Sequence, residues 1–380
     1  MRILIFADIF GAISTTFIYN EVIELAKEHT VKFVCTKREN VEIFPFENVV
    51  EIPFELKKLT RRWRWELEKR DISLNFKNIK YKNEIDAVIS EFKPNLIHCH
   101  FGYEALKILE NSYSSNIPYV ISFRGYDASQ MLRRNSYVNL LSKYTRRLNV
   151  HSTFVCEFLL TNVIEKKVPL NKTQILYSGT NLSFFKRSNY LKKKKFIFLQ
   201  ISGFGDKKGH KYTIRAYAKF VENNPNHNSN LILAGNGKHL AYMKRLVGEL
   251  KLENVVRFPG KVEKHQSREL LEEASCFVHH SVIADNGDCE GIPNAIMEAM
   301  AMELPILSTF HGGISELVEN EVNGYLIEEK EIIEYSVKMN LVLKWGLKEI
   351  NRDKIKNKFE LSIHMKMLND FYQNITNKQY

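Results

Sequence analysis

The alternation of short apolar runs with longer amphipathic stretches constrains the fold of this chain more than any other feature. Strand-like runs cover residues 2–6, 31–35, 96–98, 119–122 and 174–177, with helical periodicity at 16–28, 84–92 and 103–110. Strands that alternate with helices are typical of a parallel β-sheet with helices on its faces. The first half of the chain therefore predicts one doubly wound α/β domain.

The same alternation starts again after four consecutive lysines at 192–195. Strand-like runs at 196–201, 230–234, 255–258, 276–279 and 305–308 alternate with helix-like stretches at 212–221, 240–250, 266–274, 294–302 and from 315. We therefore predict two tandem Rossmann-like domains, over residues 1–188 and 196–345, that face each other across a cleft. A helical tail over 346–380 is expected to pack back toward the first domain. Ligands of such folds bind outside the carboxyl ends of the strands.

The composition is that of a folded protein, with 44% apolar and 26% charged residues. The net charge of +11 is shared about equally by the two halves and suits anionic partners such as nucleic acid, anionic lipid or a phosphorylated small molecule. Five scattered cysteines form no CxxC pair, which indicates a reducing compartment and neither a disulfide framework nor a zinc site. No apolar run is long enough for a membrane span, and the start of the chain does not read as a signal peptide. We expect a cytoplasmic protein.

The segment 285–302, DNGDCEGIPNAIMEAMAM, is the richest in residues that carry chemistry. It passes from a strand-like run through a glycine-containing loop into a helix, with Pro293 expected in the first turn. The free N–H groups of a helix N-terminus favour an anion such as a diphosphate. Glu290 and Glu298 are too far apart for a paired acid and base, but both can accept hydroxyls of one elongated ligand. The alternative is an ordinary loop acid at 290 and a solvated helix face at 298.

Glycine-containing turns follow two further strands of the second series. They are residues 203–210, GFGDKKGH, and residues 235–237, GNG. Glycines let the backbone approach a phosphate closely, and Lys207 or Lys208 supplies a countercharge. Each turn is weak by itself, but together with the loop at 285–293 they indicate a nucleotide-shaped, phosphate-bearing ligand.

These motifs occur in an order that resembles the retaining glycosyltransferases of family 4, which have the GT-B fold. Residues 290–301, EGIPNAIMEAMA, resemble the E-x7-E motif of that family. Other segments also resemble sequence elements of this family. They are STTFI at 14–18, HCHFG at 98–102, SFRGYD at 122–127, KGH at 208–210, the segments 175–185 and 310–317, and NGY at 323–325. The likeness extends over more than 300 residues. Members of this type commonly build bacterial surface polysaccharides.

The resemblance implies transfer of a sugar from a UDP, GDP or ADP sugar to a saccharide hydroxyl, with retained anomeric configuration and no required metal or other cofactor. The implied catalytic residues are Glu290, which holds donor sugar hydroxyls, Lys208, which pairs with the departing diphosphate, and Arg124. The implied donor-binding residues are Glu298 at the ribose, Gly291, Ile292, Pro293, Asn294, Gly203, Gly235, and the turn Gly260, Lys261 and Val262 at the base. On the acceptor side they are Ser14, Thr15, His100 and Asp127.

Three positions depart from the family pattern. The family usually has arginine where this chain has Gly203, so Lys208 lacks a second cation unless Arg133, Arg134 or Lys207 compensates. The family's histidine is Arg124 here, a permanent cation that cannot act as a neutral imidazole. The family's glutamate is Thr15 here. These changes affect the expected mechanism more than the expected fold.

His98 and His100 lie two residues apart in one strand-like run. We expect them to point to opposite faces of the strand, with one in the core and one reaching the cleft. On that expectation they share no metal ion, and no metal site is predicted.

The segment Lys57–Arg70, KKLTRRWRWELEKR, is basic and carries two tryptophans. Such a helix suits the surface of an anionic membrane, where lipid-linked acceptors occur, and would make the protein peripheral at the inner face. The alternative is a solvated helix whose tryptophans pack inward, or a loop that grips an acidic acceptor.

Three other functions compete with transfer. A catalytically degenerate sugar-nucleotide or glycan-binding subunit is the main alternative, because Gly203 and Arg124 depart from the family. A sugar-nucleotide epimerase or phosphorylase is disfavoured by the intact 290–298 segment. Nucleic-acid binding rests on charge alone, and we expect no nucleic-acid partner.

Overall fold

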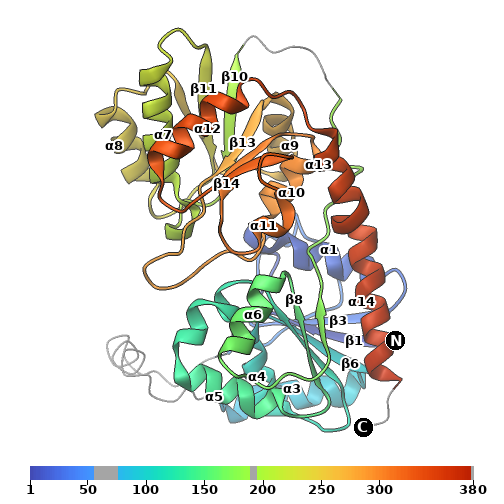
Figure 1. The fold of residues 1–380 in the computed structure, drawn as a ribbon. Coiled ribbons are helices and arrows are strands. Elements are labelled where there is room, and N and C mark those ends of the chain that lie inside the picture. Colours follow the sequence, from blue (N-terminus) through green and yellow to red (C-terminus); the bar gives the residue numbers. More distant parts are fainter. Residues whose placement is uncertain (55–75, 189–194, 378–380) are drawn as a thin grey trace. The chain divides into compact units, whose positions relative to one another are not determined.

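The computed structural model of the chain describes residues 1–54, 76–188 and 195–377 and divides into two compact units (Figure 1). Unit 1 consists of Met1–Tyr177 and His364–Tyr380, and unit 2 of Ser178–Ile363. The prediction of two doubly wound α/β domains with a helical C-terminal segment is confirmed. Residues 178–188, which were assigned to the first domain, belong to unit 2, and residues 364–380 of the tail belong to unit 1. The basic segment Lys57–Arg70 lies outside the described residues.

Unit 1 is built on a seven-stranded parallel sheet in the order β5-β3-β1-β6-β7-β8-β9. Its strands are β1 Arg2–Phe6, β3 Thr30–Cys35, β5 Val49–Glu51, β6 Leu96–His100, β7 Tyr119–Phe123, β8 Val150–Phe154 and β9 Thr173–Ile175, while β2 Ile9–Phe10 pairs with β4 Lys37–Arg38. Its helices are η1 Ile13–Thr15, α1 Thr16–Leu25, α3 Ile79–Phe92, α4 Gly102–Ser112, η2 Tyr126–Ala128, η3 Gln130–Arg133, α5 Asn135–Thr145 and α6 Glu157–Glu165.

The central strands of this sheet are buried along their whole length, because helices cover both faces. Such strands read as continuous apolar runs, which made β1, β3 and β7 predictable. Strand β8, VHSTF, was missed because it contains three consecutive polar residues, yet His151, Ser152 and Thr153 are all buried. Their polarity is satisfied inside the fold, partly through the bond of Thr153 Oγ1 to Ser122 Oγ (2.6 Å).

Unit 2 contains a six-stranded parallel sheet in the order β12-β11-β10-β13-β14-β15. Its strands are β10 Phe196–Ile201, β11 Ser229–Ala234, β12 Val256–Gly260, β13 Cys276–His279, β14 Ile306–Thr309 and β15 Gly324–Ile327. Its helices are η4 Asp206–Lys208, α7 His210–Asn223, α8 Leu240–Glu249, α9 Lys264–Glu273, α10 Asn294–Ala301, α11 Ile314–Leu317, α12 Ile332–Val342, α13 Glu349–Lys354 and the π-helix η5 Ile355–Phe359.

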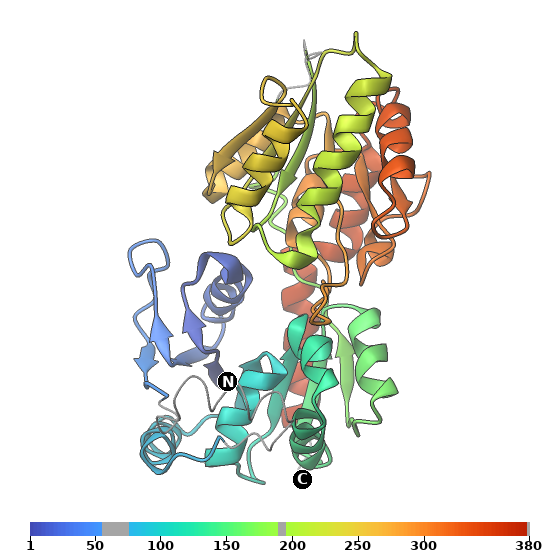
Figure 2. The ribbon, with the colours of Figure 1, turned by 90° about the vertical axis from the view of Figure 1, so that its left-hand side faces the viewer.

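One core of unit 2 lies between the sheet and helices α7, α8 and α12, which cover one face of it (Figure 2). Alternate strand residues such as Phe198, Leu231 and Leu307 point into this core, and Tyr217 of α7 and Met339 of α12 meet them there. Since side chains of a strand alternate between faces, the neighbours Leu199, Ile232 and Ile306, which are also fully buried, face the other helical layer.

Helix α14, Leu361–Thr376, ends the described chain. From His364 onward it belongs to unit 1, where Tyr372 donates to His98 Nδ1 or accepts from it (2.6 Å). Among the helices in the described ranges, none has the length and apolarity that a membrane span requires.

Candidate functional site

A lysine–glutamate pair lies at the carboxyl edge of the second sheet. Lys208 ends the short turn η4 after β10, and Glu290 lies in the loop after β13. Lys208 Nζ is 2.5 Å from Glu290 Oε1, and their side chains remain 22% and 10% exposed. Strands β10 and β13 are neighbours from which the sheet is extended in opposite directions. The pair therefore occupies the topological switch point of the sheet, where ligands of open α/β sheets bind.

Lys207 adds a second cation to this edge. Its Nζ donates to Asp288 Oδ1 (2.9 Å) and to the carbonyl oxygen of Cys289 (3.2 Å). Burial lowers the pKa of Lys207, but the charges of Glu290 and Asp288 outweigh that effect and raise it above its usual value. Lys207 is thus charged at neutral pH, and both lysines contact the loop that carries Glu290.

The charge state of Glu290 follows from the same groups. Burial alone would raise its pKa, but Lys208, then Lys207 and His279, outweigh burial and lower it to about 2. Glu290 is therefore a carboxylate at neutral pH and accepts hydrogen bonds without donating a proton. His279 ends β13 beside the pair, and burial together with the charge of Lys208 lowers its pKa to about 3.

The backbone around Glu290 is held by close packing and by a histidine. Glu290 N–H donates to His311 Nε2 (2.9 Å), so the ring proton of a neutral His311 lies on Nδ1, which is 2.6 Å from Glu329 Oε1. Gly312 has φ +52°, and a Cβ there would meet the carbonyl oxygen of Glu290 at 2.2 Å. Gly209 after Lys208 is equally constrained, with φ +61°, and a Cβ there would lie 1.6 Å from the carbonyl oxygen of His280.

Helix α10 begins directly after this loop. Pro293 is its N-cap with φ −66°, one residue earlier than the expected first turn, and Gly291 and Pro293 are buried while Ile292 and Asn294 are half-buried. Glu298 lies further along the same helix and is half-buried. Burial raises its pKa to about 7, with Lys264 opposing that shift. Glu290 and Glu298 thus have opposite electrostatic environments, although both come from one motif.

The remaining predicted donor-side residues lie on neighbouring loops of the same edge. Gly235 after β11 has φ +142°, and its N–H donates to the carbonyl oxygen of Gly260, the last residue of β12 (2.7 Å). Lys261 is exposed and Val262 half-buried in the turn before α9. Gly203 after β10 is exposed, and a Cβ there would meet only the carbonyl oxygen of Asn236 at an ordinary 3.5 Å. The backbone therefore does not require glycine at 203.

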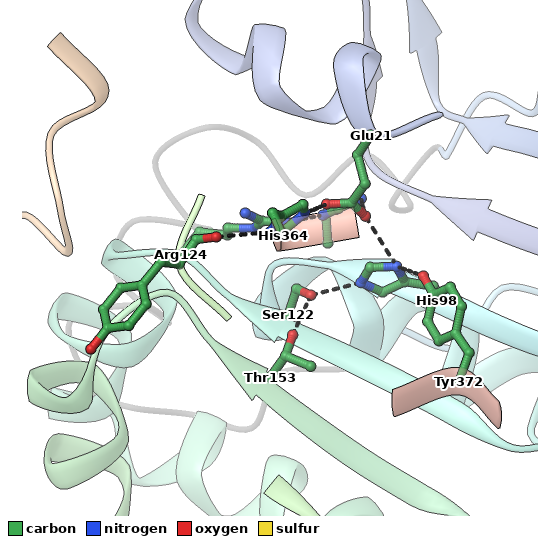
Figure 3. Close-up of polar contacts among 9 residues, drawn as sticks. Glu21, His98, Ser122, Arg124, Thr153, His364 and Tyr372 are labelled. Atoms are coloured by element: carbon green, nitrogen blue, oxygen red, sulfur yellow. Dashed lines mark hydrogen bonds and ion pairs between the residues drawn. The ribbon is translucent and has the colours of Figure 1, made fainter. Parts of the chain in front are cut away.

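Arg124 belongs to unit 1, where its side chain is only 5% exposed. It donates through Nη2 to Glu21 Oε2 (3.0 Å) and to His100 Nδ1 (3.2 Å), and its guanidinium lies 4.5 Å from the ring centre of Phe17. Figure 3 shows the surrounding network, in which Glu21 and Arg124 face His364 of α14. These contacts hold the Arg124 side chain inside unit 1, and the catalytic role expected from the family resemblance stays a prediction.

Glu21 is the centre of this network, which sequence reasoning missed. Its Oε2 also lies 3.2 Å from His364 Nε2, and its Oε1 lies 3.4 Å from both His98 Nδ1 and His100 Nε2. Burial raises the pKa of Glu21, but these neighbours outweigh burial and hold it well below its usual range. Nothing in the local sequence marks Glu21, because its partners come from three distant segments.

The expectation that His98 and His100 point to opposite faces is wrong. Residues two apart in a strand share a face, and the two rings are 4.5 Å apart, both facing Glu21. With Glu21 they bring three ligand atoms within 4.8 Å of one another. The donor set nevertheless does not fit a cation. The proton of His100 lies on Nε2 because Nδ1 accepts from Arg124, and the charge of Arg124 repels a metal.

The other predicted acceptor-side residues are also in unit 1. Asp127 is fully buried and accepts from the backbone N–H groups of Gly102 (2.7 Å), Gly125 (2.9 Å) and Arg124 (3.1 Å), so it caps the start of α4. Thr15 and Ser14 lie in η1 before α1, where Thr15 Oγ1 donates to the carbonyl oxygen of Ala12 (3.3 Å). The carboxylate of Asp127 therefore positions the backbone of the loops after β6 and β7.

Comparison with known proteins adds a family match in unit 2. Residues 183–360 match the family described as glycosyl transferases group 1. WcaL of Escherichia coli strain K12, named as a putative colanic acid biosynthesis glycosyltransferase, is 43% identical over 89 residues, which are 23% of this chain and 22% of WcaL. The amylovoran biosynthesis glycosyltransferase AmsK of Erwinia amylovora is 40% identical over 97 residues, 26% of this chain and 24% of AmsK. The matches thus span less than a quarter of these two relatives.

The whole chain is similar in fold to a solved glycosyltransferase from Rickettsia africae ESF-5, with a TM-score of 0.76 over 100% of this chain and 99% of that chain, at 16% sequence identity. Alr3699/HepE of Anabaena, solved in complex with UDP, superposes with a TM-score of 0.76 over 98% of this chain and 100% of that chain, at 17% sequence identity. A complex of the same protein with UDP-glucose gives a TM-score of 0.72. The chain has the GT-B fold of these structures, as the sequence motifs predicted.

Proposed function

We propose that this protein is a retaining glycosyltransferase that moves a sugar from a nucleotide-diphosphate sugar to a hydroxyl of a saccharide in polysaccharide biosynthesis. The observation that carries the proposal is the pair Lys208–Glu290, with Lys207 beside it, at the switch point of the second sheet and directly before helix α10. The match of residues 183–360 to glycosyl transferases group 1 and the names of WcaL and AmsK support the reaction class.

In this proposal the two lysines hold the diphosphate. Charge accumulates on the leaving phosphate as the bond to the sugar breaks, and preorganised cations stabilise that charge most where water is partly excluded. Lys207 and Lys208 are both partly buried and both contact the loop of Glu290. They supply the positive charge that an arginine at position 203 provides in the family. The proposal therefore requires no metal ion to neutralise the diphosphate.

Glu290 acts on the donor sugar as a hydrogen-bond acceptor. Its pKa of about 2 leaves it ionised at neutral pH, so it does not protonate the leaving group. Binding of the donor requires its hydroxyls to compete with Lys208 for the same carboxylate. Glu298, the second carboxylate of the motif, is the fifth residue of α10 and does not lie next to Glu290 along the chain, and we propose that the departing phosphate itself takes the acceptor's proton. That is attack from the face of the leaving group, and it gives retention.

Glu298 is proposed to bind the ribose. Its carboxyl has no hydrogen-bond partner among the described residues and is half-buried, with a raised pKa. A buried carboxyl without a partner is costly, and a ribose diol can satisfy it. The donor base would lie near the turn Gly260–Val262.

The experiment measures thermal unfolding with UDP, GDP, ADP and their sugar conjugates, followed by transfer to saccharide acceptors. A ligand at ~100 times its dissociation constant adds about 2.7 kcal/mol to the free energy of unfolding. UDP is the first choice, because HepE was solved with UDP and with UDP-glucose. A shift lost in Glu298→Ala, together with transfer that retains the anomeric configuration by NMR, supports the proposal. Binding without hydrolysis or transfer would instead favour a degenerate sugar-nucleotide-binding subunit. We further propose that the saccharide acceptor is linked to a lipid at the inner face of the membrane. Transfer to lipid-linked acceptors in vesicles tests this.

A further inference from the structure

Three loops at the carboxyl edge of the second sheet meet at one buried histidine. His311 follows β14, which ends at Thr309, and Glu329 follows β15, which ends at Ile327. Glu290 lies in the loop after β13. These three strands are parallel neighbours, so the segments that follow them lie at the same edge of the sheet. The side chain of His311 is 0% exposed and that of Glu329 is 20% exposed.

The hydrogen bonds of these residues have a defined direction. A peptide N–H can only donate, so the bond from the N–H of Glu290 makes His311 Nε2 an acceptor (2.9 Å). The ring proton of a neutral His311 therefore lies on Nδ1 and is donated to Glu329 Oε1 (2.6 Å). The other carboxylate oxygen of Glu329 accepts from the N–H of Ile283 (2.8 Å). His311 and Glu329 thus hold the loop after β13 at two points, Ile283 and Glu290.

Glu329 is ionised in this arrangement. Burial raises its pKa, but the hydrogen bonds from His311 and from the N–H of Ile283 outweigh burial and lower the pKa below its usual value. A carboxylate accepts through both oxygens and cannot donate to Nδ1. It therefore selects the tautomer of His311 whose Nε2 carries a lone pair for the N–H of Glu290.

The backbone on both sides of Glu290 is attached to the loop after β14. The N–H of Glu290 is bound to His311, and the carbonyl oxygen of Gly291 accepts from the N–H of Gly313 (2.7 Å). Gly312 packs against the same backbone, since a Cβ there would lie 2.2 Å from the carbonyl oxygen of Glu290. Fixed peptide groups on both sides of a residue set the direction of its Cα–Cβ bond. The loop after β14 therefore determines where the carboxylate of Glu290 points.

The anchor of this N–H is a side chain and not a backbone group. Residues 280–293 belong to no helix or strand, so the N–H of Glu290 has no partner in a regular hydrogen-bond ladder. Without the His311 ring this N–H would be buried and unpaired, which is costly, and the loop would rearrange to recover a partner. The position of Glu290 therefore depends on residue 311 and, through the tautomer, on residue 329.

We propose that His311 and Glu329 are positioning residues for the donor sugar, because they hold Glu290 in the orientation in which its carboxylate accepts the sugar hydroxyls. The inference rests on the proposed function, since it takes Glu290 as the group that contacts the donor sugar. Neither His311 nor Glu329 is proposed to touch the substrate. The diphosphate and the ribose are assigned to other side chains, so His311 and Glu329 should affect the sugar part of the donor and not the nucleotide part.

The first test measures the tautomer of His311 in the full chain without ligand. NMR of the protein labelled with ¹⁵N-histidine distinguishes a proton on Nδ1 from a proton on Nε2, and His311→Gln assigns the signals of His311 by their loss. At neutral pH we expect the proton on Nδ1. A proton on Nε2, alone or together with one on Nδ1, would overturn the proposal, because Nε2 could then not accept from Glu290.

The second test compares turnover with nucleotide binding. His311→Ala removes the anchor, and kcat should fall by about 10-fold to 100-fold, since a displacement of ~1 Å at a reacting group can cost about 100-fold. The affinity for UDP, measured by thermal shift, should stay nearly the same, whereas the affinity for UDP-glucose should fall. Glu329→Gln keeps one acceptor oxygen for two N–H donors and should lower kcat in the same way, by a smaller factor.

Two further variants separate positioning from packing. His311→Gln places an amide oxygen near the position of Nε2 and should recover most of the lost turnover. His311→Phe keeps a ring of similar size without the acceptor nitrogen and should be as slow as His311→Ala. His265→Gln, an exposed histidine of α9, is the matched control and should leave kcat unchanged. If His311→Phe turns over as fast as His311→Gln, or if UDP and UDP-glucose lose affinity equally, the positioning role is wrong. This comparison holds even where His311→Ala does not fold.

The behaviour of the wild type separates this inference from the proposed function. A wild type that binds none of UDP, GDP, ADP or their sugar conjugates and transfers no sugar contradicts both. A wild type that transfers sugar, together with His311→Phe and Glu329→Gln variants that transfer it equally fast, leaves the proposed function intact and contradicts only the positioning role.

Discussion

Each unit places a basic residue against a glutamate near the carboxyl ends of its parallel strands, but the two pairs differ in access. Arg124 and Glu21 of unit 1 are 5% and 2% exposed and are surrounded by three histidines. Lys208 and Glu290 of unit 2 are 22% and 10% exposed. The same chemistry is therefore closed off in one unit and open to a ligand in the other. A charged pair indicates a binding site only where the tertiary structure leaves it accessible.

The largest expected effect is on the closed pair. Glu21→Ala leaves the Arg124 guanidinium buried without its carboxylate, which typically costs about 3–5 kcal/mol. We expect a loss of that size in the free energy of unfolding, measured by urea denaturation. Glu290→Ala is the matched change in unit 2 and should cost much less stability. A larger loss of stability in Glu290→Ala than in Glu21→Ala would contradict the view that the pair in unit 1 is the structural one.

The open pair should matter for turnover instead. Lys208→Ala removes a cation at the departing diphosphate and should lower kcat by about 100-fold to 1,000-fold, the range seen when one preorganised donor is lost. The melting temperature should change little. Lys219→Ala, an exposed lysine of α7, is the control and should leave the rate unchanged. Turnover like that of the wild type in Lys208→Ala would show that Lys207 alone is sufficient.

A smaller effect concerns pH. The pKa of Glu298 is raised to about 7, above the value of an unfolded chain, so its contribution to stability is full at low pH and is lost as pH rises through 7. The melting temperature of the wild type without ligand should therefore fall between pH 5 and 8, and Glu298→Gln should flatten this part of the profile. If the melting temperature falls equally with pH in both proteins, a group other than Glu298 causes the change.

The smallest effect is expected at Gly203. A side chain there meets only the carbonyl oxygen of Asn236 at 3.5 Å, so Gly203→Arg should change the free energy of unfolding by less than about 1 kcal/mol. The added cation lies on the loop that carries Lys208 and should tighten nucleotide binding. Gly209→Ala is the contrasting variant, since φ is +61° and its Cβ would collide with the carbonyl oxygen of His280. Equal stability of the two variants would contradict this distinction.

Much of the fold could be predicted from the sequence, because buried parallel strands are continuous apolar runs and the intervening helices have apolar stripes. Strands β10 and β13 were predicted to the residue, and the motifs around Lys208 and Glu290 lie on the expected loops. Strand β8 was missed because three of its five residues are polar although they are buried, and helices α5 and α6 were also missed. The chain returns to unit 1 at His364, within the tail that was expected to pack back toward the first domain.

The sequence by itself determined which residues carry chemistry and in what order along the chain. Tertiary structure decided how each one is used. Arg124 is clamped by Glu21, His98 and His100 share one face, and Asp127 caps a helix, none of which is visible from local spacing. The physical reason is that the pKa, the access and the hydrogen-bond partners of a side chain depend on groups brought together from distant segments. Residue identity is local, whereas electrostatic environment is a property of the folded chain.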